Sequence, residues 1–132
     1  MICFIDFETT GIDVFKDNPI EIGAVLINSE GVITKKFHSL IKPRTNRIAS
    51  KAAFKTHGIE VNNLIIAPTQ EEVLKSFFEE FGTEFRFAGW NINFDVSFFR
   101  RMCHNANKMR EFNKINHRHI DVQTIKYLAV EL

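Results

Sequence analysis

Two acidic residues, Asp6 and Glu8, stand two positions apart at the end of an apolar run. Residues 2–7 are mostly apolar, which predicts a strand buried on both faces. In an extended strand, residues i and i+2 project from the same face, so both carboxylates can reach one point at the strand end. Paired carboxylate oxygens suit Mg²⁺ or Mn²⁺ and are poor zinc ligands. By itself such a pair is common, and it is more typical of an ordinary turn at a strand end than of a metal site.

Two further segments carry side chains that could belong to the same site. Thr9, Thr10 and Gly11 follow the acidic pair and offer small side chains and backbone N–H groups, which a nucleotide could approach closely. Asp95 closes the segment 91–95 (Asn-Ile-Asn-Phe-Asp), where a strand gives way to a helix. Asp95 could join a metal site, or it could only stabilise the helix dipole.

Hydrophobic periodicity and turn residues predict an α/β fold that positions these side chains. Strands are expected over 2–7, 20–28, 32–41, 85–90 and 119–122, and helices over 46–57, 69–81, 93–103 and 124–132. Thr69 is expected to cap the second helix and Gly82 to end it. The first three strands should be antiparallel, with 85–90 parallel to the first strand, and the carboxylates of Asp6, Glu8 and Asp95 should converge within one metal shell. Trp90 and Cys103 are expected in the core, and Asp121 as a structural cap.

Composition and charge indicate one soluble globular domain of 132 residues, with 45% apolar and 25% charged residues. No apolar run approaches the roughly 20 residues of a membrane span, and no leader pattern opens the chain. Cys3 and Cys103 match no disulfide or zinc spacing, which favours a reduced, cytoplasmic protein. Residues 31–59 carry seven Lys or Arg and no acid, and residues 100–118 carry six against one acid. Such basic stretches could form phosphate-binding surfaces on either side of an acidic metal-binding pocket. They could also be solvated loops and helix faces with no ligand.

The order of these segments resembles the DEDD exonuclease family of the ribonuclease H-like superfamily, which includes proofreading subunits of polymerases. Residues 4–11 (Phe-Ile-Asp-Phe-Glu-Thr-Thr-Gly) resemble its first motif, and residues 91–95 resemble its second catalytic motif. Residues 20–24 (Ile-Glu-Ile-Gly-Ala), 57–59 (His-Gly-Ile) and 119–124 (His-Ile-Asp-Val-Gln-Thr) resemble other segments of the family, so the resemblance spans nearly the whole chain. A PIN-type nuclease also clusters acids on an α/β sheet, but it does not predict Thr-Thr-Gly followed by Ile-Glu-Ile-Gly-Ala.

The resemblance implies a ribonuclease H-like mixed sheet and 3′→5′ hydrolysis of terminal phosphodiesters in single-stranded DNA or RNA, in proofreading or end trimming. Asp6 would bridge two Mg²⁺ or Mn²⁺ ions, Glu8 would hold the ion nearer the nucleophile, and Asp95 would orient the other. The residues that would contact the terminal nucleotide are Thr9, Thr10, Gly11, His57, Asn91 and Phe94. Expected partners are single-stranded 3′ ends and either a polymerase or a second copy of the chain, with no membrane partner.

The family's third motif, His-x4-Asp or Tyr-x3-Asp, has no match in place. That motif would supply a fourth carboxylate and the general base. Residues 1–132 are therefore expected to be a C-terminally incomplete exonuclease domain with weak activity by itself. The alternative is a nucleic-acid or nucleotide-binding module of the same fold that has lost catalysis.

Overall fold

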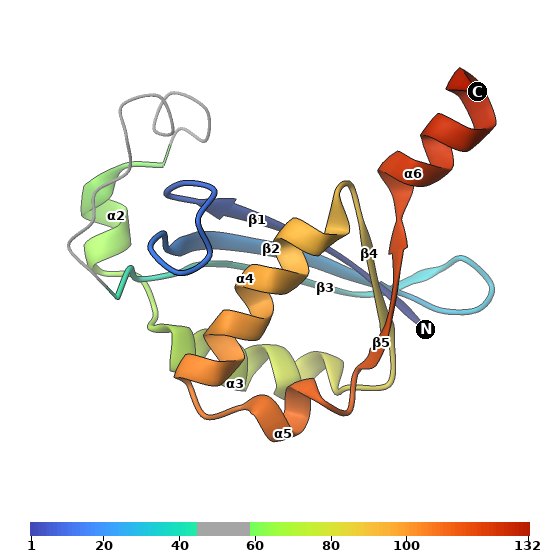
Figure 1. Cartoon of the computed structure of the whole chain (residues 1–132). Coiled ribbons are helices and arrows are strands. Elements are labelled where there is room, and N and C mark those ends of the chain that lie inside the picture. The colour runs from blue at the N-terminus through green and yellow to red at the C-terminus, as the bar shows by residue number, and fades with distance from the viewer. Residues whose placement is uncertain (45–58) are drawn as a thin grey trace.

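The computed structural model describes residues 1–44 and 59–132, which build a five-stranded sheet of order β3-β2-β1-β4-β5 (Figure 1). The strands are β1 (Ile2–Thr9), β2 (Pro19–Ile27), β3 (Ile33–Leu40), β4 (Arg86–Gly89) and β5 (Asn116–Asp121). β1 and β2 pair antiparallel, as do β2 and β3, whereas β4 is parallel to β1 and β5 is parallel to β4. The predicted mixed sheet is confirmed, including the parallel pairing of β1 with β4.

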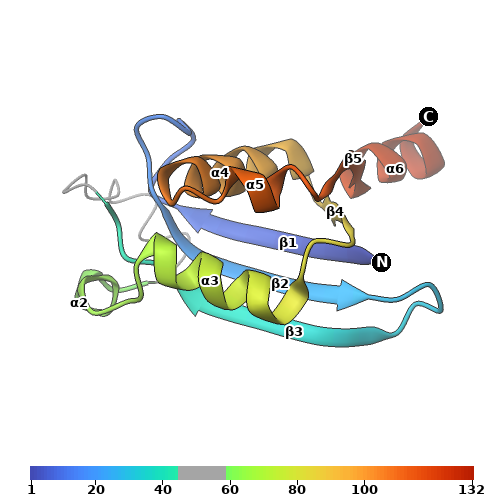
Figure 2. The same cartoon turned by 90° about the horizontal axis from the view of Figure 1, so that it is seen from below.

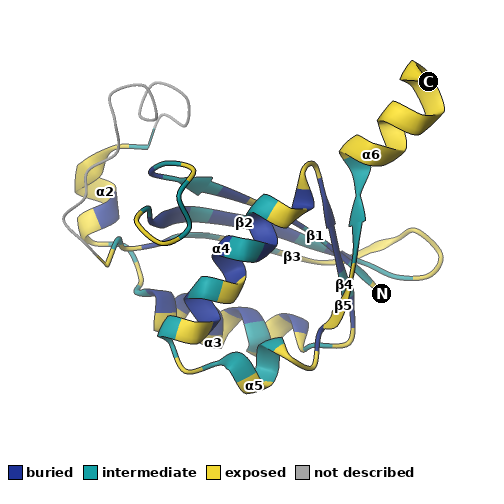
Figure 3. Ribbon diagram, viewed as in Figure 1, coloured by how far each residue is buried: buried dark blue, intermediate teal, exposed yellow. Residues whose placement is uncertain are grey.

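One face of the sheet carries the core. Cys3, Ile5 and Phe7 of β1 are buried, whereas Asp6 between them is exposed, because successive strand residues point to opposite faces (Figure 3). The helices are α2 (Val61–Ile65), α3 (Gln70–Phe81), α4 (Ile92–Asn105), α5 (Met109–Phe112) and α6 (Val122–Lys126), followed by a π-helical turn, η1 (Tyr127–Glu131). Helices α3, α4 and α5 gather on the core face, while α6 projects beyond the sheet (Figures 1 and 2).

Local capping signals decide where α3 begins and ends. The Thr69 side chain accepts a hydrogen bond from the Glu72 amide, and Gly82 ends the helix with a φ of 64°. Both predictions are confirmed. The short helices α2 and α5 were not predicted, because four or five residues show no complete apolar period. The helix predicted over 46–57, and with it His57, lies outside the described residues.

Phenylalanine rings fill the core between the sheet and the helices. The side chain of Phe77 on α3 is fully buried, with ring centroids of Phe81, Phe99 and Phe37 at 4.9, 5.2 and 5.5 Å. Cys103 is buried as predicted. No helix within residues 1–44 and 59–132 is long and apolar enough to cross a membrane.

Trp90 contradicts the expectation that it belongs to the core, since 53% of its surface is exposed. It follows the last residue of β4, where the chain leaves the sheet, so neither sheet face nor helix layer covers it. The Lys126 ammonium lies 5.5 Å from its ring centroid, a cation–π contact that links α6 to the end of β4.

Candidate active site

A hydrogen bond from β1 to α4 brings the third acid to the acidic pair. The parallel ladder between β1 and β4 covers Ile2–Phe4, and farther along β1 the Phe7 amide donates to Asp95 Oδ1 at 2.8 Å. Phe7 stands between Asp6 and Glu8 in the chain. Asp95 is therefore attached to the stretch of β1 that carries both other acids, although 88 residues separate the two hydrogen-bonded groups.

The turn before α4 fixes the position of Asp95. Gly89 ends β4, and a Cβ added there would lie 2.9 Å from the Ile5 carbonyl oxygen, so only glycine allows this close approach. Asn91 follows in the left-handed region with φ of 52°. Its amide donates to Asp121 Oδ1 at 3.0 Å, and the same oxygen caps α6 by accepting from the Gln123 amide. Asp121 is the structural cap that was predicted, and it also holds the turn that starts α4.

The charges of neighbouring acids raise the pKa values of Asp95 and Asp6. Burial raises the pKa of Asp95 to about 6, and the charges of Asp6 and Glu8 add to that rise, while the Phe7 amide opposes it. Desolvation of its carboxylate also raises the pKa of Asp6, and the charge of Glu21 raises it further. A cluster of carboxylates that repel one another is an environment in which a divalent cation relieves the unfavourable charge.

The acids nevertheless do not converge as tightly as expected. In the part of the chain that the structure describes, no three His, Cys, Asp or Glu side chains are close enough to hold a metal ion together. Asp6 projects from the sheet face opposite α4, whereas Asp95 approaches from the helix side and is engaged by the Phe7 amide. The donor set still fits Mg²⁺, which is usually bound through one or two carboxylates together with water and substrate phosphates.

The open face of the sheet adds two residues that the sequence did not single out as a pair. Glu21 stands opposite Glu8 in the β1–β2 register, and its Oε2 lies 2.7 Å from His38 Nε2. A cavity of about 700 Å³ on this face is lined by Asp6, His38 and Trp90, among others. His38 enters the site only through the pairing of β2 with β3, so nothing in its local sequence identifies it.

The loop after β1 uses its predicted substrate-binding side chains internally. Thr9 Oγ1 donates to the Gly11 carbonyl oxygen at 2.6 Å, and Thr10 Oγ1 bonds Asp17 Oδ1 at 3.2 Å. A Cβ at Gly11 would lie 2.4 Å from Asp17 Oδ2, so glycine lets this loop close. Asn91 is exposed at the start of α4, whereas Phe94 is half-buried, with its ring 5.0 Å from that of Phe98. The two threonine hydroxyls therefore shape the loop. The Thr10 amide does so as well, since it donates to the Asn18 carbonyl oxygen at 2.9 Å, and the Gly11 amide is the group of this loop that could face a ligand.

Replacing Asp95 by Asn is expected to stabilise the metal-free protein at neutral pH. The pKa of Asp95 is about 6 in the folded protein, above the usual value of 3.8, so the folded protein holds this proton more tightly than the unfolded chain. Wild-type stability should consequently fall as the pH rises from about 4 to about 6, by roughly 2–3 kcal/mol in total. Asn keeps an oxygen for the Phe7 amide and removes the charge. Urea unfolding in EDTA at pH 4 and pH 7.5 measures both effects.

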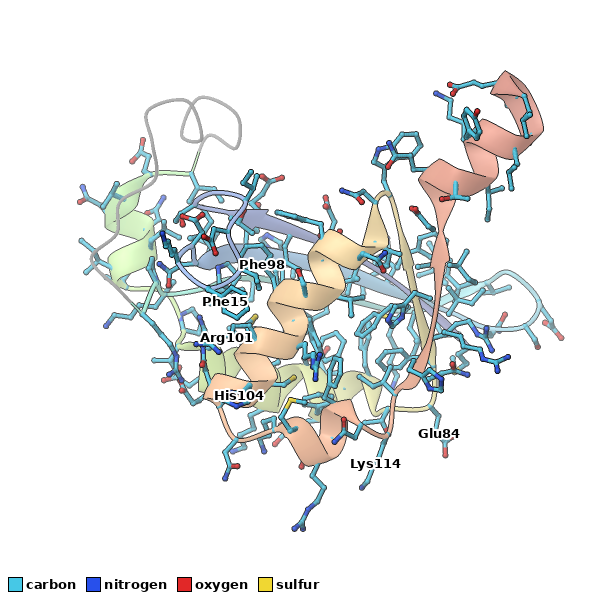
Figure 4. The ribbon with its side chains drawn as sticks, in the orientation of Figure 1. Phe15, Glu84, Phe98, Arg101, His104 and Lys114 are labelled. Atoms are coloured by element: carbon cyan, nitrogen blue, oxygen red, sulfur yellow. The ribbon has the colours of Figure 1, made fainter. Side chains whose placement is uncertain are left out.

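The free energy of unfolding of Asp95→Asn should exceed that of wild type by about 1–3 kcal/mol at pH 7.5 and differ little from it at pH 4. Glu84→Gln is the matched control, since Glu84 is an exposed acid far from this site (Figure 4). An Asp95→Asn protein that is less stable than wild type at pH 7.5 would contradict the assignment of Asp95 as a buried, repelled carboxylate.

Comparison with known proteins places this arrangement in a family. The profile of the RNase_T family, described as exonuclease, matches residues 3–131. The PolC-type DNA polymerase III of Thermotoga maritima is 41% identical over 96 residues, which are 73% of this chain and 7% of that protein. The DNA polymerase III subunit epsilon of Buchnera aphidicola subsp. Schizaphis graminum is 34% identical over 105 residues, covering 76% of this chain and 44% of the relative.

A solved structure shares the fold. E. coli exonuclease I, crystallised with a 5cy-dA13 oligonucleotide, superposes with a TM-score of 0.81 at 17% identity and covers 98% of this chain and 30% of that one. This chain thus spans less than half the length of each of these relatives. Because the family profile covers nearly all of its residues, the chain belongs to the RNase_T exonuclease family.

Proposed function

We propose that this chain is the catalytic domain of a metal-dependent 3′→5′ exonuclease that hydrolyses terminal phosphodiesters of single-stranded nucleic acid. The observation that supports it most is the Phe7–Asp95 hydrogen bond, which joins a carboxylate on α4 to the strand end bearing Asp6 and Glu8. Membership of an exonuclease family supports the reaction class. The 3′→5′ direction rests on the resemblance of residues 4–11 and 91–95 to the DEDD motifs.

Asp6 and Glu8 would hold Mg²⁺ or Mn²⁺, with Asp95 contributing directly or through water. Their oxygen-only chemistry and the raised pKa values of Asp6 and Asp95 support a hard divalent cation at this place. When bound, such ions would supply activation of a water molecule and charge stabilisation of the leaving 3′ oxygen. The repulsion among the acids would be relieved in the loaded enzyme.

The chain's own groups would position the terminal nucleotide. The loop 9–11, closed by its threonine hydroxyls and by the Thr10 amide, would present the Gly11 amide to the nucleotide beside β1. Asn91, exposed at the start of α4, would contact the sugar or phosphate, and Phe94 would lie beside the base. His57 would contact the same nucleotide. Glu21, bonded to His38, would act as a positioning residue behind Glu8.

The partners would be single-stranded 3′ ends and a polymerase. Relatives described as DNA polymerase III subunits support the polymerase, and exonuclease I in complex with an oligonucleotide supports the single strand. Proofreading would follow from association with a polymerase, and end trimming from action without one.

Oligonucleotides labelled at either end test the proposed direction. With Mn²⁺ or Mg²⁺, a 5′-labelled strand should shorten one nucleotide at a time, and a 3′-labelled strand should release labelled mononucleotide from the start. EDTA should stop both. Release of a mononucleotide from the 5′ end first, or internal cuts, would contradict the proposal. Tight binding of the strand without any cleavage would favour the alternative, a nucleic-acid-binding module of the same fold that has lost catalysis.

A further inference from the structure

The solvent-facing side of α4 forms a groove beside the loop that follows β1. Asn93, Ser97, Arg100, Arg101 and His104 recur at intervals of three or four residues and therefore share this side of the helix. Together with Phe15 from the loop after β1, they line a cavity of about 460 Å³, which we term the α4 groove. The groove runs from Asn93, two residues before Asp95 in the chain, to His104, and covers twelve residues of helix, about 16 Å from first to last.

Phe15 is the most unusual side chain of this groove. It is 78% exposed, although the chain has a Phe-rich core in which it could be buried. The Arg101 guanidinium lies 5.8 Å from its ring centroid, and Figure 4 shows Phe15, Arg101 and His104 following one another along α4. A guanidinium on the ring leaves an aromatic surface open for stacking with a planar ligand.

The loop that carries Phe15 is held by its own hydrogen bonds. The Phe15 amide donates to Asp13 Oδ1 at 2.9 Å, and the Asp13 amide donates to Asp17 Oδ2 at 3.0 Å. Asp17 also accepts from Thr10 Oγ1, which ties the loop to the end of β1. The exposed ring is thus presented by an ordered turn, and holding it ready lowers the entropic cost of binding a partner.

The charges of the groove select an anionic partner. Within residues 1–44 and 59–132, neither Arg100 nor Arg101 forms an ion pair with a carboxylate. The acids on the adjoining loop, Asp13 and Asp17, are half-buried and accept the hydrogen bonds that shape the loop. Cationic side chains interleaved with an exposed aromatic ring are the combination that binds single-stranded nucleic acid without reading its sequence.

We propose that the α4 groove binds the upstream part of a single strand whose 3′ end lies at Asp6, Glu8 and Asp95. Phe15 stacks on a base several nucleotides from the end, and Arg100 and Arg101 contact the phosphates. The length of about 16 Å accommodates several nucleotides at the roughly 3.4 Å rise of a stacked strand. This inference rests on the proposed exonuclease function and adds to it a subsite that long substrates use and very short ones do not reach.

Substrate length provides the test. In Phe15→Ala, kcat/KM for an oligothymidylate of twelve nucleotides should fall about tenfold, through KM, while kcat/KM for a trinucleotide stays within about twofold. Phe15→Trp keeps a stacking surface and should restore the rate on the long strand. In the double variant Arg100→Gln, Arg101→Gln, the slope of log Kd against log salt for the long strand, measured in EDTA, should fall by about 1.4, because each lost contact to a single strand contributes about 0.7.

Matched controls separate the groove from general effects. Val32→Ala removes an exposed apolar side chain in the β2–β3 turn, and Lys114→Gln removes an exposed cation away from the groove (Figure 4). Both should retain wild-type values. If wild-type protein cleaves from the 3′ end and the groove variants match it on both substrate lengths, this inference is wrong and the proposed function stands. If wild-type protein neither cleaves nor binds the strand, both are wrong.

Discussion

Replacing Asp6 by Asn is expected to lower the rate of phosphodiester hydrolysis by about 10³-fold or more. The carboxylate would hold a divalent cation whose charge stabilises the transition state by several kcal/mol, and about 4 kcal/mol corresponds to roughly 10³-fold in rate. The loss should appear in kcat, because stabilisation confined to the transition state does not change ground-state binding. Single-turnover cleavage of a 5′-labelled oligonucleotide in Mn²⁺ measures it.

Two further measurements make this result specific to the metal site. Because the pKa of Asp6 is raised in the folded protein, its carboxylate does not stabilise the fold, so Asp6→Asn should unfold no more readily than wild type in EDTA. Calorimetric titration with Mn²⁺ should show weaker binding by the variant. Glu30→Gln, which alters an exposed acid in the β2–β3 turn, is the control. Equal Mn²⁺ affinity in wild type and Asp6→Asn would remove Asp6 from the proposed site.

Replacing Phe77 by Ala is expected to remove about 3–5 kcal/mol from the free energy of unfolding. Its ring is fully buried and contacts rings from the sheet and from two helices, including Phe37, Phe81 and Phe99. The surrounding layers cannot close over the lost volume without moving α3 or α4. Domains of this size are stable by only about 5–15 kcal/mol, so the variant would lose a large share of its stability. Urea unfolding followed by circular dichroism measures the difference.

The same substitution at Phe15 is the control for Phe77. Phe15→Ala removes an identical side chain, but one that is 78% exposed, and should change the free energy of unfolding by less than about 0.5 kcal/mol. A loss below about 1 kcal/mol at Phe77 would show that the helix layer does not depend on this cluster of rings. Phe77 packs against Phe99 of α4, and the same helix carries Asp95. Phe77→Ala should therefore also weaken the Phe7–Asp95 hydrogen bond and lower the rate of phosphodiester hydrolysis.

Features decided by neighbouring residues were predictable from the sequence. The alternation around Asp6 and Glu8 follows from the period of a strand, and the limits of α3 follow from the Thr69 cap and Gly82. The mixed sheet followed from the order of strands and helices, together with the resemblance of the motifs to a known family. Trp90 was placed wrongly, since its apolar character carries no information about whether another element covers it.

The chain by itself determined which residues are acidic, where the first four strands and the longer helices α3 and α4 lie, and the family to which the chain belongs. Tertiary structure alone decided that Asp95 bonds the Phe7 amide, that Glu21 meets His38, and that Arg101 lies over Phe15. It also decided that Asp6, Glu8 and Asp95 do not lie close enough together to hold one metal ion as three ligands. These contacts join residues that are far apart in sequence, and their geometry depends on strand register and helix packing. A local pattern specifies the conformation of a segment, whereas the distance between two segments is set by how the whole core packs.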